Sequence, residues 1–142
     1  MTSFTRFFKR AAVVLAGTAL AASTATVSAN AADGVPSIGY GHSLNGNAVW
    51  CVQHQYNYYV GTHSFVVALS DLPASVAEDS QWGPETQNMV IKWQTFWGLQ
   101  PDGIVGPQTG HQFLWVGDPY YTGKGSSNPS NAYCYGLIPG TL

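Results

Sequence analysis

The sequence predicts an all-α fold, a small three-helix bundle with an irregular C-terminal tail that is pinned by a disulfide. Three observations predict it. A turn-forming phrase that can begin a helix occurs twice, an apolar stripe with helical spacing follows the first copy, and two cysteines are present. An even cysteine count in an exported chain favours a bond between Cys51 and Cys134, although two free thiols or metal ligands would also fit the count.

Residues 1–31 have the pattern of a secretory signal peptide. Three basic residues precede an apolar stretch at 11–22, and small residues at 27–31 offer two alternative cleavage positions. A membrane anchor is the competing interpretation, but about 12 apolar residues are too few to cross roughly 30 Å of hydrocarbon as a helix. We therefore expect no membrane span and a secreted, extracellular protein that can associate with the cell wall.

Removal of this segment changes the charge of the protein. The whole chain has 5 basic and 7 acidic residues, and three of the basic residues lie within 1–31. The remainder has two lysines against seven carboxylates, which is a net charge of −5. Such a chain has no long-range attraction for a polyanion, so we expect no nucleic-acid partner. We expect a monomer.

Residues 32–45 are assigned as a lead-in, 46–115 as the folded domain and 116–142 as the tail. A first helix is expected from about Ala48 to Tyr59. The connection from Gly61 to Glu78 contains the apolar run 65–69, whose periodicity fits a short strand or a helical turn equally well. The inner face of the first helix is predicted to consist of Val49, Val52, Tyr56 and Tyr59.

The repeated phrase is Asp79–Thr86, which recurs 23 positions later as Asp102–Thr109 with Asp, Gly, Pro and Thr in the same places. Pro suits the first position of a helix, where no N–H is needed, and Thr then lies in the first turn. Asp can accept hydrogen bonds from loop N–H groups. Each phrase therefore predicts a turn that begins a helix.

Two further helices follow from these turns. After the first turn, the apolar residues have the spacing of one helical face, and Gly98 with Pro101 ends the helix. A shorter helix follows Pro107. From Gly117 onward Gly, Ser, Asn, Pro and Tyr dominate, which indicates an irregular tail that Cys134 ties to the first helix. The expected apolar faces are Met89, Val90, Trp93, Phe96 and Trp97 in one helix, and Phe113 and Leu114 in the other.

These segments resemble the peptidoglycan-binding-like domain family, a three-helix module of bacterial cell-wall hydrolases. Residues 46–53 are similar to the "G-x-x-V-x-x-L-Q" start of its first helix, and 79–86 followed by Trp93-Gln94 are similar to "D-G-x-F-G-x-x-T … F-Q". Residues 98–109 match "G-L-x-x-D-G-x-V-G-P-x-T" almost letter for letter. Ser80 and Trp82 depart from the usual Gly and Phe, and the tail lies outside the pattern.

The resemblance implies non-catalytic attachment to peptidoglycan or a related cell-wall polymer, without a cofactor. Sugar rings present apolar faces that stack on aromatic rings, while amide and hydroxyl side chains contact their polar groups. For Trp82 the alternative is a core residue, and for the two aspartates it is a purely structural role in the turns. The candidate binding residues are Trp50, Tyr58, Asp79, Trp82, Asp102, Tyr120 and Tyr121.

A small wall hydrolase is the competing enzymatic interpretation. The histidines show no His-x-x-x-His or His-Glu-x-x-His zinc spacing, and no Gly-x-Ser-x-Gly elbow occurs. A Cys51–His54 dyad would lose its thiol to a disulfide. Asp79 and Glu85 could form a carboxylate pair, but one belongs to the turn and the other to a first helical turn, where negative charge is favourable. We therefore expect no catalytic residue and no metal site.

A third class is a secreted interaction protein or inhibitor built on the same scaffold, because a fold does not fix a function. The long connection at 61–78 and the pinned tail would then form the partner surface.

Overall fold

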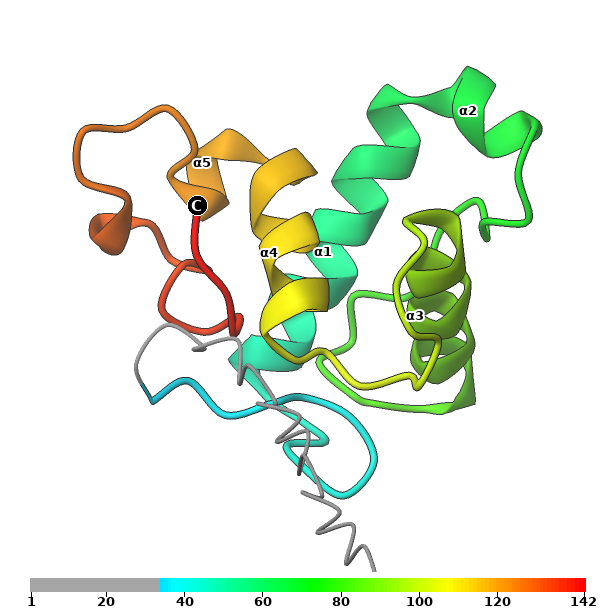
Figure 1. Cartoon of the computed structure of the whole chain (residues 1–142), viewed down its shortest axis with the longest axis horizontal. Helices are drawn as coiled ribbons and strands as arrows, with labels where there is room; N and C mark the ends of the chain where they lie inside the picture. Colours follow the sequence, from blue (N-terminus) through cyan, green and yellow to red (C-terminus); the bar gives the residue numbers. More distant parts are fainter. Residues whose placement is uncertain (1–33) are drawn as a thin grey trace, which may run out of the picture.

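The computed structural model describes residues 34–142, and the predicted signal peptide at 1–31 lies outside them. Within the described range the chain is helical, with three isolated bridge pairs and no strand, which confirms the all-α prediction. The helices are α1 (Asn47–Thr62), α2 (Ser64–Ala68), α3 (Pro84–Phe96), α4 (Pro107–Val116), α5 (Pro119–Thr122) and the 3-10 helix η1 (Pro129–Asn131). Figure 1 shows α1 and α4 at the centre, with α3 on one side and the tail on the other.

Aromatic rings join the three main helices. Trp93 of α3 is fully buried and stacks on Phe113 of α4, with ring centroids 4.8 Å apart. Tyr56 and Tyr59 of α1 approach the same indole edge-on, at 5.7 and 5.0 Å. Such offset and edge-on pairs add to the stability that burial of the rings provides.

Burial raises the pKa of Tyr56, whose hydroxyl donates to the carbonyl of Pro73. The predicted inner face of the first helix is confirmed, and Trp97 is half-buried beside it.

The long connection contains a helix. Residues 64–68 form α2, which resolves the choice between strand and helical turn, and none of its residues is buried. Phe65 is 76% exposed. The returning chain is fixed by Asn57 of α1, whose amide donates to the carbonyl of Val76 and accepts from its N–H, both at 2.9 Å.

The lead-in contacts both turns. Ile38 is buried and exchanges two backbone hydrogen bonds with Val105, at 3.1 and 2.9 Å. The carbonyl of Leu44 accepts from the N–H of Trp82 at 2.8 Å. The short bridges therefore attach the lead-in to the two loops that begin α3 and α4.

The tail is more regular than its composition predicted. Asp118 accepts a hydrogen bond from the N–H of Tyr120, Pro119 occupies the first helical position, and Gly123 ends the short α5 in the left-handed region. This local capping chemistry produces a helical turn that composition alone does not reveal. The end of the tail packs closely on α4, because a Cβ at Gly110 would lie only 1.6 Å from the carbonyl oxygen of Pro139.

The predicted disulfide is present. Cys51 and Cys134 are both buried and bonded, with their Cα atoms 5.6 Å apart, so the alternatives of free thiols or metal ligands do not apply. Among residues 34–142, no helix has the length and apolar character needed to cross a bilayer.

Candidate functional site

The first repeated phrase, Asp79–Thr86, folds as a polar turn that we call the first turn unit. One carboxylate oxygen of Asp79 accepts from the backbone N–H of Gln81 and from the side-chain amide of Gln53, both at 2.9 Å. Gln53 is buried on α1 and also donates to the Gln81 carbonyl and the Thr86 hydroxyl, at 3.0 and 3.1 Å. Its own oxygen accepts from the N–H of Ser80 at 3.0 Å. A single buried amide therefore organises the whole loop.

The second phrase, Asp102–Thr109, forms the second turn unit with the same chemistry. The buried amide of Gln94 donates to Asp102, to the Ile104 carbonyl and to the Thr109 hydroxyl, at 2.8, 3.0 and 3.0 Å. Its oxygen accepts from the N–H of Gly103 at 2.8 Å, and Asp102 accepts from the N–H of Ile104. The sequence repeat is thus a repeat of hydrogen bonds around one glutamine side chain, from α1 in the first turn unit and from α3 in the second.

Both candidate aspartates therefore hold loops in place. The backbone N–H of Gln81 and the amide of Gln53 keep the pKa of Asp79 below its usual value. Each aspartate also borders a hollow beside the start of a helix, of about 450 Å³ at Asp79 and about 370 Å³ at Asp102. The hydrogen bonds show the structural role that the sequence analysis gave as the alternative to ligand binding.

Trp82 lies in the core. Its side chain is 6% exposed, and the indole N–H donates to the side-chain oxygen of Gln87 at 2.7 Å. An indole that is buried and already bonded offers no open face to a sugar ring. The structure thus places Trp82 as a core residue, which is the alternative that was given for it, and not among the exposed rings.

Three of the predicted candidates come together elsewhere. Trp50 of α1 and Tyr120 and Tyr121 of α5 line one open hollow with Tyr133, which follows η1. We call this the ring-lined hollow; its volume is about 450 Å³, within the range of small-molecule sites. Tyr120 is 82% exposed and Tyr133 is 49% exposed. Trp50 meets Tyr121 and Tyr133 edge-on, with ring centroids 5.4 and 6.1 Å apart.

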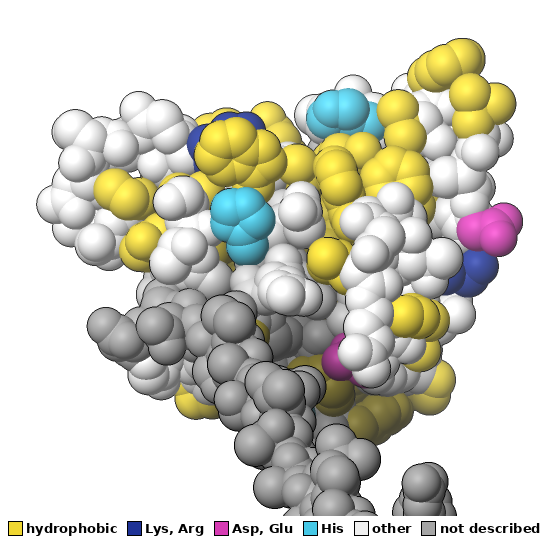
Figure 2. Space-filling model, viewed as in Figure 1, with side chains coloured by type: hydrophobic (Ala, Val, Ile, Leu, Met, Phe, Trp, Pro, Cys, Tyr) yellow, Lys and Arg dark blue, Asp and Glu magenta, His cyan; other side chains and the backbone are white. Residues whose placement is uncertain are grey.

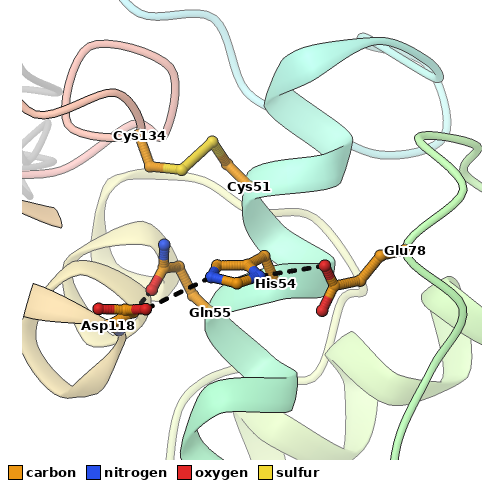
Figure 3. The surroundings of a disulfide bond; sticks show 6 residues. All are labelled: Cys51, His54, Gln55, Glu78, Asp118 and Cys134. Atoms are coloured by element: carbon orange, nitrogen blue, oxygen red, sulfur yellow. Dashed lines mark hydrogen bonds and ion pairs between the residues drawn. A yellow bond between two sulfur atoms is a disulfide. The ribbon is translucent and has the colours of Figure 1, made fainter. Parts of the chain in front are cut away.

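His54 packs against two of the rings that line the hollow. It lies one helical turn after Trp50, stacks on that indole with ring centroids 4.6 Å apart, and meets Tyr121 edge-on. Figure 3 shows its imidazole between Glu78 and Asp118. The Nδ1 atom lies 3.0 Å from a Glu78 oxygen and shares a hydrogen bond with it. The Nε2 atom is buried and lies 3.6 Å from Asp118.

The disulfide fixes the two sides of the hollow relative to each other. Cys51 directly follows Trp50, and Cys134 directly follows Tyr133. The N–H of Cys134 also donates to the carbonyl of Tyr121 at 2.9 Å. The disulfide (Figure 3) and one backbone hydrogen bond thus connect the three chain segments that supply rings.

The remaining candidate, Tyr58, does not line this hollow. It lies on α1, two turns after Trp50, and is half-buried. The residues that sequence reasoning did not assign to a site are Tyr133, His54 and the two glutamines Gln53 and Gln94. Each of them has a feature in the sequence that could have indicated its place. Tyr133 directly precedes a cysteine, and His54 follows Trp50 by one helical turn. Both glutamines lie in the segments that match the family motifs.

The face drawn in Figure 2 is poor in charged side chains, and hydrophobic ones gather over α4, the neighbouring part of α1 and α2. The described residues therefore form a small helical module in which two similar polar turns each begin a helix. Comparison with known proteins gives the same class. The model of a family described as a putative peptidoglycan binding domain matches residues 65–111, which run from α2 into α4.

An uncharacterized protein from the bpoA1 3′ region of Kitasatospora aureofaciens is 43% identical over 49 residues. The matched segment covers 34% of this chain and 37% of that protein. No solved structure matches the chain. The predicted resemblance to the peptidoglycan-binding family is confirmed at 65–111, and this match supports peptidoglycan binding in general. The ring-lined hollow is formed by residues outside the matched segment.

Proposed function

We propose that this chain is a secreted, non-catalytic protein that binds peptidoglycan or a related cell-wall polymer. The match of residues 65–111 to a peptidoglycan binding domain carries the proposal. The matched segment contains both turn units and all of α3, so it includes the repeated structure that distinguishes this fold.

Export is supported by the disulfide. Bonds between cysteines persist in oxidising compartments outside the cytosol, and Cys51 and Cys134 are both bonded. The signal-peptide pattern at 1–31 points to the same compartment. A wall polymer is reached only from that side of the membrane.

A non-catalytic role is supported by what the candidate catalytic groups do. Asp79 accepts hydrogen bonds from Gln81 of its turn and from Gln53 of α1. Glu78 is bound to His54 and Asn57. The sulfur of Cys51 is part of the disulfide, which removes the nucleophilic thiol. Glu85 lies in the first turn of α3, where it complements the helix dipole.

Co-sedimentation with purified insoluble peptidoglycan tests the binding proposal. The oxidised protein is expected in the pellet, while a helical protein of similar size and net charge stays in solution. Peptidoglycan stripped of covalently attached polymers, compared with whole walls, separates the polymer classes. Recovery of the chain in the supernatant with both materials would remove the binding proposal and favour the interaction-protein alternative.

The non-catalytic part has its own test. We expect no change in the turbidity of a wall suspension during prolonged incubation and no soluble fragments detectable by mass spectrometry. Release of sugar-containing or peptide fragments above a heat-inactivated control would show a hydrolase instead.

A further inference from the structure

We propose that the ring-lined hollow is a binding site for the glycan strand of the wall polymer, taking the apolar face of a sugar ring. The inference rests on the proposed wall-binding function and specifies the part of the polymer that is recognised. The hollow lies outside the segment that matches the peptidoglycan binding domain, so it is a site that the family match does not assign.

The chemistry of the lining selects the ligand. Four rings, Trp50, Tyr120, Tyr121 and Tyr133, line the hollow, and no acidic or basic residue is among these lining side chains. Charged stem peptides gain little from such a surface, because their carboxylates and amines would be desolvated without an opposite charge. An uncharged sugar ring loses little by the same desolvation, and its apolar face can lie against the indole or phenol rings.

The phenol groups supply the polar contacts. A tyrosine hydroxyl can both donate and accept a hydrogen bond, so three of them around one hollow can match the hydroxyl and acetamido groups on the edge of a sugar. Tyr120 and Tyr133 project furthest into solvent, at 82% and 49% exposure. Their large exposed rings offer contact area at a low cost in conformational entropy.

The hollow is held in shape before a ligand arrives. Trp50 rests on His54, which is bonded to Glu78, and the disulfide holds Tyr133 beside Trp50. Since rigid rings need little ordering on binding, more of the contact energy appears as affinity. The fixed geometry distinguishes this hollow from exposed single rings such as Tyr40 in the lead-in.

The proposal is tested by titrating the oxidised protein with a soluble tetramer of β-1,4-linked N-acetylglucosamine, followed by calorimetry and tryptophan fluorescence. The changes Tyr120→Ala and Tyr133→Ala are expected to weaken binding about tenfold each, as for central aromatic contacts in other interfaces. Both side chains are exposed, so the fold should tolerate their removal. Tyr40→Ala is the matched control, because Tyr40 has the same 49% exposure as Tyr133 and does not line the hollow.

The outcomes separate the site from the function. If the wild-type protein sediments with peptidoglycan and both hollow variants sediment equally well, the glycan site is wrong while wall binding stands. If an isolated stem peptide binds and the sugar tetramer does not, the ligand assignment is overturned. If the wild-type protein neither sediments nor binds the tetramer, the proposed function and the site both fail.

Discussion

The turn units and the ring-lined hollow use their polar and aromatic side chains in opposite ways. In the turns, the buried amides of Gln53 and Gln94 and one carboxylate oxygen each of the exposed Asp79 and Asp102 are bonded within the protein. In the hollow, the side chains of Tyr120 and Tyr133 are exposed to solvent. The difference indicates that the repeated motif builds the scaffold, while the open rings are available for a ligand. Changes in the turns should therefore alter stability, and changes at the exposed rings should alter binding.

The largest effect on stability is expected from the disulfide. The bond closes a loop of 83 positions, for which chain entropy gives a loss of at most about 4–5 kcal/mol on removal. Urea unfolding of the double variant Cys51→Ala/Cys134→Ala, compared with the oxidised wild type, measures this loss. A reductant should destabilise the wild type and leave the double variant unchanged. Equal stability of the oxidised and reduced wild type would show that the tail is held by packing alone.

The second-largest loss of stability is expected when Gln53 or Gln94, the glutamine at the centre of each turn unit, is replaced. Replacement of Gln94 by Ala removes four hydrogen bonds and leaves buried turn groups without partners, so unfolding should become easier by about 2–3 kcal/mol. Gln53→Ala should cost a similar amount, since its contacts are the same in kind. Gln108→Ala, at an exposed position, is the matched control. A much smaller effect at Gln53 would mean that the two turns are not equivalent.

Substitutions at the second position of the repeat should change stability in opposite directions in the two turn units. Gly103 and Ser80 hold the same place in the repeat, and both have positive φ, 71° and 62°. A Cβ on Gly103 would lie 1.9 Å from the amide nitrogen of Gln87, whose oxygen is bonded to Trp82. Gly103→Ala should therefore destabilise the protein by about 1–2 kcal/mol.

The opposite change, Ser80→Gly, relieves a left-handed conformation that is unfavourable for serine. It should stabilise the protein by about 0.5–1 kcal/mol. Thermal unfolding of the two variants gives both values, and a destabilising Ser80→Gly would show that the serine side chain makes a contribution larger than the strain.

The smallest effect is a pH dependence at Asp79. Its pKa in the folded protein lies below the ordinary value of 3.8, so its contribution to stability is complete above that value and is lost as the pH falls through the lowered one. Asp79→Asn should remove this part of the acid sensitivity. Urea midpoints near neutral pH and at about pH 3 would show it. A wild type and variant with the same loss of stability between these pH values would contradict the assignment.

Much of the scaffold was predictable because it depends on local rules. The Gly-Pro-x-Thr phrases mark the starts of α3 and α4, and apolar spacing marks their inner faces, except at Phe96, which was predicted on the inner face and is 37% exposed. The short α5 was not predicted, because it depends on one capping aspartate within a segment of irregular composition. Helix α2 remained undecided in the sequence, since an apolar run of five residues fits either structure.

The candidate site was predictable only in part. Trp50, Tyr120 and Tyr121 could be named as surface rings, but their meeting in one hollow depends on the path of the tail between α5 and Cys134. Trp82 could not be placed, because a tryptophan in a loop fits a core position as well as a binding surface. It is buried beside the lead-in, where its N–H donates to the carbonyl of Leu44, a contact between distant parts of the chain.

The most direct test of the account compares one variant from each region in the same peptidoglycan sedimentation assay. We expect the oxidised wild type and the turn variant Ser80→Gly to pellet alike, and the hollow variant Tyr133→Ala to require about tenfold more peptidoglycan for the same pelleted fraction. A wild type that stays in the supernatant would contradict wall binding itself. Full binding by Tyr133→Ala together with a loss in Ser80→Gly would contradict the division between scaffold and site.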